Sequence, residues 1–271
     1  MPELPEVETT RRGIEPHILG NTLTRVIVHN ARLRWPVPRT LSKALAGLKV
    51  ESLERRGKYL LLGFPAGTVI LHLGMSGSLH LVDCNVAREK HDHVEFVFQD
   101  GQCLRLRDPR RFGAVLYTTR DPEQHQLLAN LGPEPLQRGF SGQHLYEHSR
   151  GKKVAVKLFI MNSKIVVGVG NIYANEALFL AGIHPKRVAG RLSAERYDRL
   201  VQAIKKVLRA AIKSGGTSLR DFTAGDGRPG YFQQKLNVYG KVGEPCPVCG
   251  TPIKHITLGQ RATYYCPHCQ T

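Results

Sequence analysis

The strongest constraint on the fold lies near the end of the sequence, where four cysteines form two pairs. The pairs Cys246-Pro-Val-Cys249 and Cys266-Pro-His-Cys269 are separated by sixteen residues, a spacing typical of a four-cysteine zinc site. About 35 residues cannot bury much core, so a metal must supply much of this module's folding energy. Four thiolates leave no open coordination position, which predicts one structural Zn²⁺. We interpret His268, between two ligands, as a bystander.

The residues between the cysteine pairs carry a second signal. Gln260-Arg261-Ala262-Thr263 falls in the middle of an expected β-hairpin. An arginine at this place is positioned to reach a phosphate, but a solvated turn arginine explains the spacing equally well. Spacing alone leaves both interpretations of Arg261 open.

The other two cysteines, Cys84 and Cys103, stand alone in the sequence. In a reducing compartment, clustered cysteines indicate metal more than disulfide.

Residues 1–10 lack a basic segment followed by an apolar run, and no stretch approaches the roughly 18 uninterrupted apolar residues of a membrane span. These features favour a cytoplasmic protein with no membrane partner.

The charge of the chain indicates its partner. Lys and Arg number 39 and Asp and Glu number 22, which gives a formal net charge of +17. So large an excess suggests a polyanionic partner, most often nucleic acid. The alternative is a basic surface that binds nothing.

Strand patterns dominate the first two-fifths of the chain. Alternation at 69–73 and the segments 93–98 and 102–106 predict strands. Asp100-Gly101, between the last two, indicates a hairpin with a type I′ turn. Several such strands, separated by turn residues, predict a sandwich or a flattened barrel.

Helical patterns occur at the start and in the second half. A short helix beginning near Pro5 is expected, and another from about Asn171 to Gly182. Apolar residues recur with helical spacing over 193–213, with Ser193 as the N-cap and a stop at 215–216.

Several motifs, in the same order along nearly the whole chain, resemble the bacterial formamidopyrimidine-DNA glycosylases, also called 8-oxoguanine DNA glycosylases. The matching segments are Pro2-Glu3-Leu4-Pro5-Glu6-Val7-Glu8, Lys58-Tyr59-Leu60-Leu61, His72-Leu73-Gly74-Met75-Ser76-Gly77, Asp108-Pro109-Arg110-Arg111-Phe112-Gly113, Val167-Gly168-Val169-Gly170-Asn171-Ile172-Tyr173 and the hairpin at 260–263. No single segment is decisive, but together they are specific.

The resemblance implies a multidomain α+β fold. Its parts would be an N-terminal β-sandwich catalytic domain with flanking helices (1–131), a linker (132–150), a helix-two-turns-helix DNA-binding domain (151–234) and a four-cysteine zinc-finger hairpin (235–271). It also implies a monomer, located in the bacterial cytoplasm with the nucleoid. The partner would be double-stranded DNA that contains oxidised purines or abasic sites.

The family's catalytic residues map onto the start of the chain. Once Met1 is removed, Pro2 would carry a secondary α-amine, which is partly neutral near pH 7 and able to attack C1′ of the sugar as a Schiff-base nucleophile. Glu3 would move protons during ring opening and elimination, and Glu6 would help to position the site. Lys58 matches the active-site lysine and Arg261 a phosphate-binding catalytic residue.

Further residues would contact DNA. Excision requires the damaged nucleotide to leave the stack, and the resemblance implies that Met75, Arg110 and Phe112 fill the gap and contact the orphaned cytosine. It also implies a DNA contact at His91. Asn171, together with Arg261, would hold phosphates.

The remaining matches add two DNA-contacting positions, and the sequence departs from the family pattern at two places. Lys157 matches a lysine linked to 8-oxoguanine handling, and residues 217–231 match a loop over the flipped base. In that loop Arg220 stands where a lysine is common. Asn162 replaces a usual aspartate, which puts a local cap or salt bridge in doubt.

The function that this resemblance implies is a bifunctional glycosylase and abasic-site lyase of base excision repair. It would excise 8-oxoguanine and formamidopyrimidines and cut the strand by β,δ-elimination. Two alternatives remain. An endonuclease VIII-like enzyme for oxidised pyrimidines typically opens Pro-Glu-Gly-Pro and lacks the Arg-Arg-Phe arrangement at 110–112, and a non-enzymatic zinc-ribbon DNA-binding protein would not need Pro2.

Overall fold

The computed structural model describes residues 2–216 and 236–271, and the chain divides into two compact units. Unit 1 holds the residues up to Ala129 together with the stretch from Ser214, and unit 2 runs from Asn130 to Lys213 and takes in the end of the chain. Among the described helices, none combines the length and apolarity needed to cross a bilayer.

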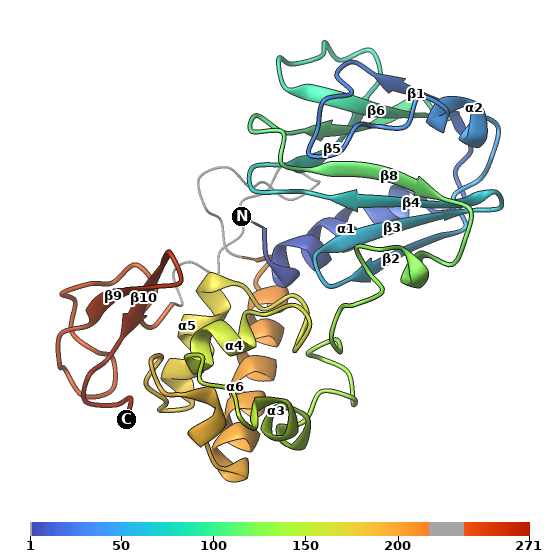
Figure 1. Ribbon diagram of the computed structural model, residues 1–271. Coiled ribbons are helices and arrows are strands. Elements are labelled where there is room, and N and C mark those ends of the chain that lie inside the picture. The colour runs from blue at the N-terminus through green and yellow to red at the C-terminus, as the bar shows by residue number, and fades with distance from the viewer. Residues whose placement is uncertain (1, 217–235) are drawn as a thin grey trace. The chain divides into compact units, whose positions relative to one another are not determined.

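Unit 1 contains two antiparallel four-stranded sheets (Figure 1). In one sheet the order is β1 (Leu23–Val28), β6 (Asp92–Phe98), β7 (Gln102–Arg107) and β5 (Ser78–Asp83). In the other it is β2 (Ser52–Arg56), β3 (Tyr59–Phe64), β4 (Gly67–His72) and β8 (Ala114–Thr118). Both sheets contribute to one hydrophobic core, with Phe96 and Leu104 from the first and Leu60 and Leu71 from the second. The predicted β-sandwich is therefore confirmed.

The hairpin between β6 and β7 differs from the predicted turn. A type I′ turn needs a positive φ at both central residues, but in this loop only Gly101 has one, at 85°. Gly101 N–H donates to Phe98 O at 3.3 Å. The loop therefore has three residues, 99–101, and ends in a left-handed glycine, which is the other common way to close a hairpin. The prediction of a two-residue type I′ turn was therefore wrong, because the loop is one residue longer.

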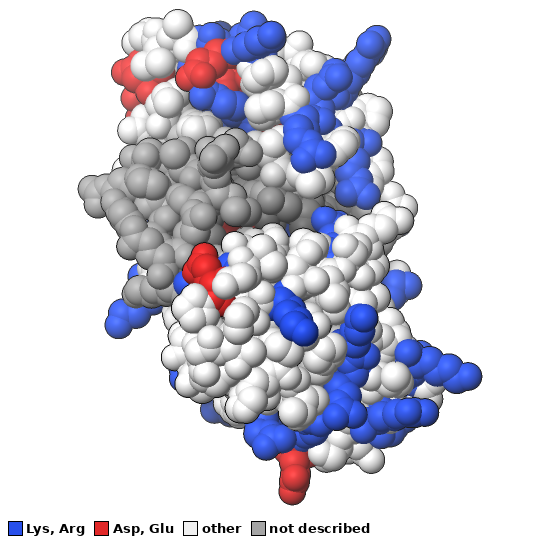
Figure 2. All heavy atoms as spheres, turned by 90° about the vertical axis from the view of Figure 1, so that its left-hand side faces the viewer, with Lys and Arg blue, Asp and Glu red and all other residues white. Residues whose placement is uncertain are grey.

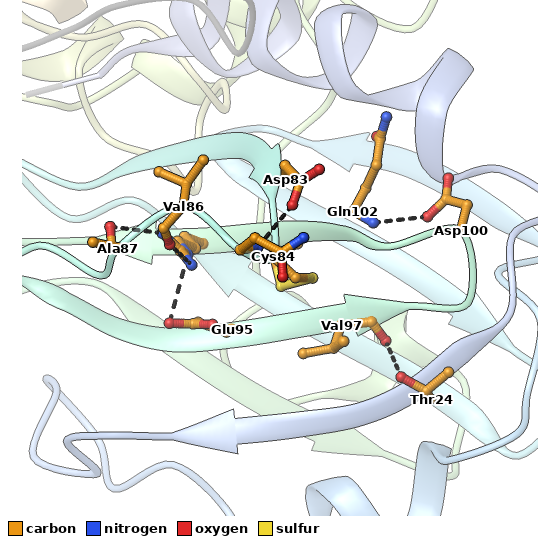
Figure 3. The surroundings of a disulfide bond; sticks show 12 residues. Thr24, Asp83, Cys84, Val86, Ala87, Glu95, Val97, Asp100 and Gln102 are labelled. Atoms are coloured by element: carbon orange, nitrogen blue, oxygen red, sulfur yellow. Dashed lines mark hydrogen bonds and ion pairs between the residues drawn. A yellow bond between two sulfur atoms is a disulfide. The ribbon is translucent and has the colours of Figure 1, made fainter.

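The two cysteines that stand alone in the sequence are joined by a disulfide (Figure 3). Cys84 directly follows β5, and Cys103 lies on β7, where it is the partner of Val82. Their spacing along the chain does not indicate this bond, because it depends on the antiparallel register of β5 and β7, which brings together residues that are 19 positions apart.

Helix α1 (Leu4–Ile18) opens unit 1 and packs on β2 and β3, with Val7, Ile14 and Ile18 in the core. Pro5 lies in its first turn, as expected, where the missing N–H costs nothing. A short helix, α2 (Leu41–Leu45), packs on β1.

Unit 2 is helical before the cysteine module. It contains α3 (Gly142–Ser149), α4 (Val156–Ile160), α5 (Asn171–Leu180) and α6 (Ala194–Lys213). The predicted ends are confirmed for α6, since Ser193 Oγ accepts a hydrogen bond from Arg196 N–H and glycines with positive φ follow at 215 and 216. Helix α3 falls inside the segment expected to be a linker, and Phe140 and Leu145 from that segment belong to the core of unit 2.

The end of unit 2 forms the expected hairpin, β9 (Lys254–Leu258) with β10 (Arg261–Tyr265). Its core is small, since among the described residues the buried cluster there consists of Phe179, Val238, Cys246, Ile253 and Cys266. So few apolar residues cannot hold a fold alone, which agrees with a metal-stabilised module.

Candidate active site and nucleic-acid interface

The candidate nucleophile lies immediately before α1. Pro2 and Glu3 are buried, and Glu3 is the N-cap of the helix. Glu3 and Glu6 form a reciprocal capping box, in which the Glu6 carboxylate accepts a hydrogen bond from Glu3 N–H at 2.8 Å. The first residues of the chain are thus fixed by the helix, with both carboxylates at its positive end.

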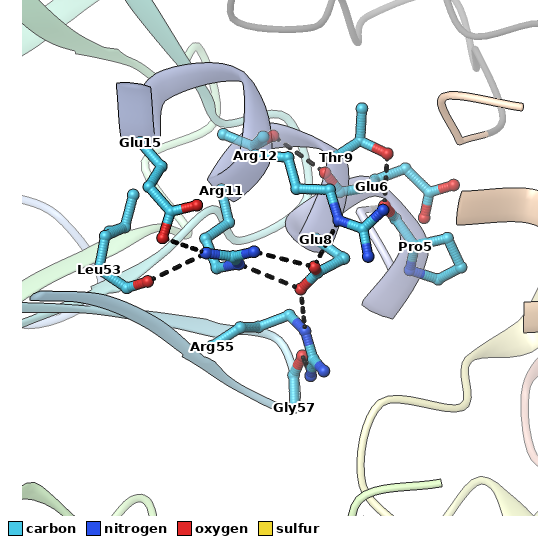
Figure 4. Close-up of polar contacts among 11 residues, drawn as sticks. Pro5, Glu6, Glu8, Thr9, Arg11, Arg12, Glu15, Leu53, Arg55 and Gly57 are labelled. Atoms are coloured by element: carbon cyan, nitrogen blue, oxygen red, sulfur yellow. Dashed lines mark hydrogen bonds and ion pairs between the residues drawn. The ribbon is translucent and has the colours of Figure 1, made fainter. Parts of the chain in front are cut away.

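The hairpin turn that carries Lys58 is tied to the same helix (Figure 4). Glu8, one turn after the cap, accepts a hydrogen bond from Arg55 Nε at 2.9 Å, and Arg55 Nη1 donates to Gly57 O at 3.0 Å. Gly57 has a φ of 59° and precedes Lys58 in the two-residue turn between β2 and β3. Helix α1 and the Lys58 turn are therefore held together by the Glu8–Arg55 pair.

The Glu8 carboxylate is the centre of an arginine cluster. Besides Arg55, it accepts hydrogen bonds from Arg11 and from Arg12, the latter at 2.7 Å. Burial acts to raise the pKa of Glu8, but the hydrogen bonds from Arg11, Arg12 and Arg55 outweigh it, and the pKa is lowered. Glu8 is therefore ionised at neutral pH. Glu8 was not predicted as a site residue.

His72, which the sequence did not single out as a site residue, lies beside the Lys58 turn. It is the cross-strand partner of Tyr59, and the two rings are in contact, with centroids 4.8 Å apart. Burial, with added repulsion from Lys58 and Arg34, lowers the pKa of His72 to about 4. The neutral ring accepts a hydrogen bond from Gly74 N–H on Nδ1 at 3.0 Å. The sequence feature that could have pointed to His72 is its place between a predicted strand and a glycine-flanked loop.

The two loops that carry the predicted gap-filling residues are joined through Asp108. This buried carboxylate accepts hydrogen bonds from Ser76 Oγ and from Gly113 N–H, both at 2.7 Å. Ser76 Oγ accepts in turn from Arg110 N–H at 3.2 Å. The Met75 loop and the loop at 110–112 therefore form one structural element.

Exposure supports a surface role for this element. Phe112 is 44% exposed, and the Arg110 guanidinium lies 5.0 Å from the centre of its ring. An aromatic side chain this open contributes little to the core. His91 lies close by, because its carbonyl accepts a hydrogen bond from Asp108 N–H at 3.0 Å. Unit 1 thus brings together the predicted residues Met75, Arg110, Phe112 and His91.

Lys157 lies on α4 of unit 2 and contacts the zinc-finger hairpin. It is fully buried, and its ammonium donates to Ala262 O at 2.9 Å and to Thr263 Oγ1. These contacts support β10 of the zinc-finger hairpin. These two contacts join α4 to the strand that Arg261 begins.

Asn171 meets the same strand. As the first residue of α5, it donates from Nδ2 to Ala262 O at 3.1 Å. One turn later, Asn175 Oδ1 accepts a hydrogen bond from Tyr264 N–H at 2.8 Å. Arg261 is exposed at the start of β10, directly after Gln260, whose φ is 60°. Unit 2 thus places Asn171 beside the strand that Arg261 begins.

Glu176 was not predicted from the sequence and holds the chain leading to the zinc module. Its buried carboxylate accepts four hydrogen bonds. Oε2 accepts from Asn237 N–H and Nδ2, and Oε1 from the N–H groups of Val238 and Tyr239, at 2.8–2.9 Å. The sequence feature that could have pointed to Glu176 is the polar Asn175-Glu176 pair inside a largely apolar helix.

The four cysteine sulfurs fit a zinc ion. All lie within 4.8 Å of one another, and the pairs Cys246–Cys269 and Cys249–Cys266 are 3.9 and 3.5 Å apart. A tetrahedron with Zn–S bonds of about 2.3 Å has edges of about 3.8 Å. Four thiolates complete such a site, so a metal here would be structural.

Known proteins match the whole chain. The family models described as the formamidopyrimidine-DNA glycosylase N-terminal domain, its H2TH domain, and a zinc finger found in FPG and IleRS match residues 1–115, 131–223 and 243–271. Proteins named formamidopyrimidine-DNA glycosylase from Nitrosococcus oceani and Methylococcus capsulatus are 57% and 59% identical over 270 residues, with 100% of each chain covered. The chain belongs to the formamidopyrimidine-DNA glycosylase family.

Solved structures of the family agree with the fold. A Lactococcus lactis Fpg in complex with DNA containing an abasic site has a TM-score of 0.93 at 36% identity, with 100% of both chains covered. The MutM (Fpg) protein from Thermus thermophilus has a TM-score of 0.89 at 37% identity, covering 99% of this chain and 98% of that one. The predicted α+β fold and zinc-finger hairpin are confirmed.

The two departures from the family pattern have different outcomes. Asn162 Oδ1 accepts a hydrogen bond from Lys164 N–H at 3.0 Å, so asparagine still provides a local cap. Arg220, like the whole loop at 217–231, lies outside the described residues.

Basic side chains predominate over acidic ones on the described part of one face of the molecule (Figure 2). On the face drawn in Figure 2, Lys and Arg occur across the described surface, whereas Asp and Glu occupy only a few places. This distribution fits the net charge of +17 and a polyanionic partner.

Proposed function

We propose that this protein excises oxidised purines from duplex DNA and then cuts the strand, with Pro2 as the nucleophile. Membership of the family makes it a DNA glycosylase of base excision repair. The observation that carries the finer proposal is the linkage of α1, which begins next to Pro2 and Glu3, to the Lys58 turn through Glu8 and Arg55. Glu3, the proposed proton donor, and the turn that carries Lys58 are thereby held by the same helix.

The proposed reaction starts after Met1 is removed. The Pro2 amine attacks C1′, the bond from C1′ to the base nitrogen breaks, and the base leaves with a proton. Glu3 donates a proton to the opening sugar ring, and Lys58 binds a phosphate or the lesion. The resulting iminium acidifies the C2′ proton, whose removal expels the 3′ phosphate, and a second elimination expels the 5′ phosphate.

DNA recognition is proposed to use both units. Met75, Arg110 and Phe112 would fill the gap left by the flipped nucleotide, with His91 as a neighbouring contact. The exposure of Phe112 supports this role. Asn171 and Arg261 would bind phosphates, and Lys157 would act by positioning the strand that carries Arg261.

The partner proposed is double-stranded DNA containing formamidopyrimidine, 8-oxoguanine or an abasic site. The similar Lactococcus lactis Fpg structures are complexes with DNA that contains Fapy-dG or an abasic site, which supports the lesion class. We also propose that the protein acts as a monomer in the bacterial cytoplasm, at the nucleoid. The relatives from Nitrosococcus oceani and Methylococcus capsulatus are bacterial, which supports that compartment.

The deciding experiment is borohydride trapping on a duplex with 8-oxoguanine opposite cytosine. Reduction of the iminium should give a covalent protein–DNA adduct that maps to Pro2 by peptide mass spectrometry. A matched chain with one extra residue before Pro2, which turns the amine into an amide, should give none. An adduct only on an oxidised-pyrimidine duplex would favour the endonuclease VIII-like alternative. No adduct on either would contradict lyase chemistry.

A further inference from the structure

The disulfide of unit 1 lies at the start of a polar surface segment. Cys84 closes the end of β5, which has one neighbour in its sheet, and is bonded to Cys103 on β7 (Figure 3). Residues 85–91 follow and lead into His91 and β6. The bond is therefore the covalent anchor of a segment that ends at a proposed DNA contact.

The segment is held otherwise by polar contacts. The buried Arg105 guanidinium donates to Val86 O at 2.8 Å and to Ala87 O at 3.2 Å. Farther along, Glu89 pairs with Arg107 at 2.7 Å. None of residues 85–91 belongs to the hydrophobic core of unit 1, and residues 85–90 are exposed. Hydrogen bonds that compete with water are individually weak, so the covalent bond makes a large difference to the order of this segment.

The two cysteines differ in exposure. Cys103 is 1% exposed, whereas Cys84 is only partly buried. Thiol–disulfide exchange requires a thiolate to approach one sulfur along the bond axis. Attack is therefore directed to Cys84, and Cys103 is the leaving thiolate, which stays inside the sheet where it can reclose the bond.

We propose that the Cys84–Cys103 bond is a reversible redox link that controls the order of residues 85–91. A dithiol reductant opens it: one thiolate attacks Cys84, Cys103 leaves and takes a proton, and the second thiol displaces Cys84, so that the reductant becomes a disulfide. A hydroperoxide closes it by oxidising the Cys84 thiolate to a sulfenic acid, with loss of water or alcohol. Condensation with the Cys103 thiol then releases water.

The functional meaning rests on the proposed function. Hydroperoxides and related oxidants also produce oxidised purines, so the link closes under the conditions in which substrate forms. A bond between residues 19 positions apart removes entropy from the unfolded chain and so shifts the unfolding equilibrium of this sheet edge by roughly two orders of magnitude toward the folded state. Oxidation thus fixes the segment that carries His91 when repair is needed.

The test uses the zinc-loaded full chain equilibrated in dithiothreitol or in hydrogen peroxide. Alkylation with N-ethylmaleimide and peptide mass spectrometry reads the state of Cys84 and Cys103 separately from the zinc ligands. Hydrogen exchange over residues 85–91 is measured in the same samples. We expect both thiols to be alkylated only after reduction, with exchange in the segment about tenfold faster or more.

The matched controls are Cys84→Ser and the double variant Cys84→Ser/Cys103→Ser, whose segment should exchange at the reduced rate in either buffer. Thiols that stay alkylatable in peroxide, a bond that dithiothreitol cannot open in the folded chain, or exchange that is equal in both states would each overturn the proposal. Borohydride trapping in parallel separates the two ideas. Loss of trapping with an intact redox response refutes only the proposed function.

Discussion

Replacing Glu176 with alanine should loosen the junction between α5 and the zinc module. The carboxylate accepts four hydrogen bonds, three of them from the backbone N–H groups of residues 237–239. Each buried N–H left without an acceptor costs about 1–3 kcal/mol. Val238 is fully buried and its neighbours are partly buried, so the total should be about 3–6 kcal/mol.

The variant Glu176→Gln tests whether the loss of stability follows the number of hydrogen bonds that are removed. Glu176→Gln keeps one carbonyl oxygen and can satisfy only one of the two donor pairs, either that of Asn237 or that of Val238 and Tyr239. It should therefore cost roughly half as much as alanine. Glu195→Gln is the matched control, since this exposed carboxylate lies on the neighbouring helix α6.

The assay is amide hydrogen exchange at residues 237–239, combined with the rate of zinc release to a chromogenic chelator. A local cost of 3 kcal/mol corresponds to exchange faster by about two orders of magnitude. Zinc release should accelerate in the order control, glutamine, alanine. Unchanged exchange in Glu176→Ala, or a glutamine variant as impaired as alanine, would refute the reasoning.

Three further predictions follow from the described contacts. The pKa of Glu8 is lowered from its ordinary value of 4.5. The ionised carboxylate therefore stabilises the fold above that pH, and this contribution is lost as the pH falls through the lower pKa of the folded state. Glu8→Gln should lower the melting temperature at pH 7, and the difference from the native protein should shrink in acid. Gly74→Ala should weaken DNA binding at least tenfold in a gel-shift assay, since a Cβ would collide with the backbone of Phe112 and Gly113, whereas Gly139→Ala meets open space and should bind normally. Chelation of zinc should abolish protection of the β9–β10 amides while leaving those of β6 and β7 unchanged, as exchange measurements can check.

Parts of this structure follow from local sequence signals. Cysteine spacing predicts the metal module, and Ser193 with the glycines at 215–216 predicts the bounds of α6, because caps and ligand turns depend on adjacent residues. The β6–β7 hairpin was located correctly, but its turn type depends on which residue takes the left-handed conformation, and Gly101 alone does so.

The contacts that sequence reasoning missed join residues distant along the chain. The Cys84–Cys103 bond needs the register of β5 against β7. The burial of Lys157 needs a partner 106 positions away, Thr263. Pairings of this kind arise from tertiary packing, and no local pattern reports them.

One carbonyl oxygen, that of Ala262, receives both the Lys157 ammonium and the Asn171 amide. Two side chains from different helices therefore share a single acceptor on the strand that Arg261 begins. Substitutions at 157 and 171 should be epistatic, because the loss of either donor leaves the other to hold the strand. We expect the double substitution to weaken phosphate binding by more than the sum of the single effects, so each position should accept a change in laboratory evolution only while the other donor is intact.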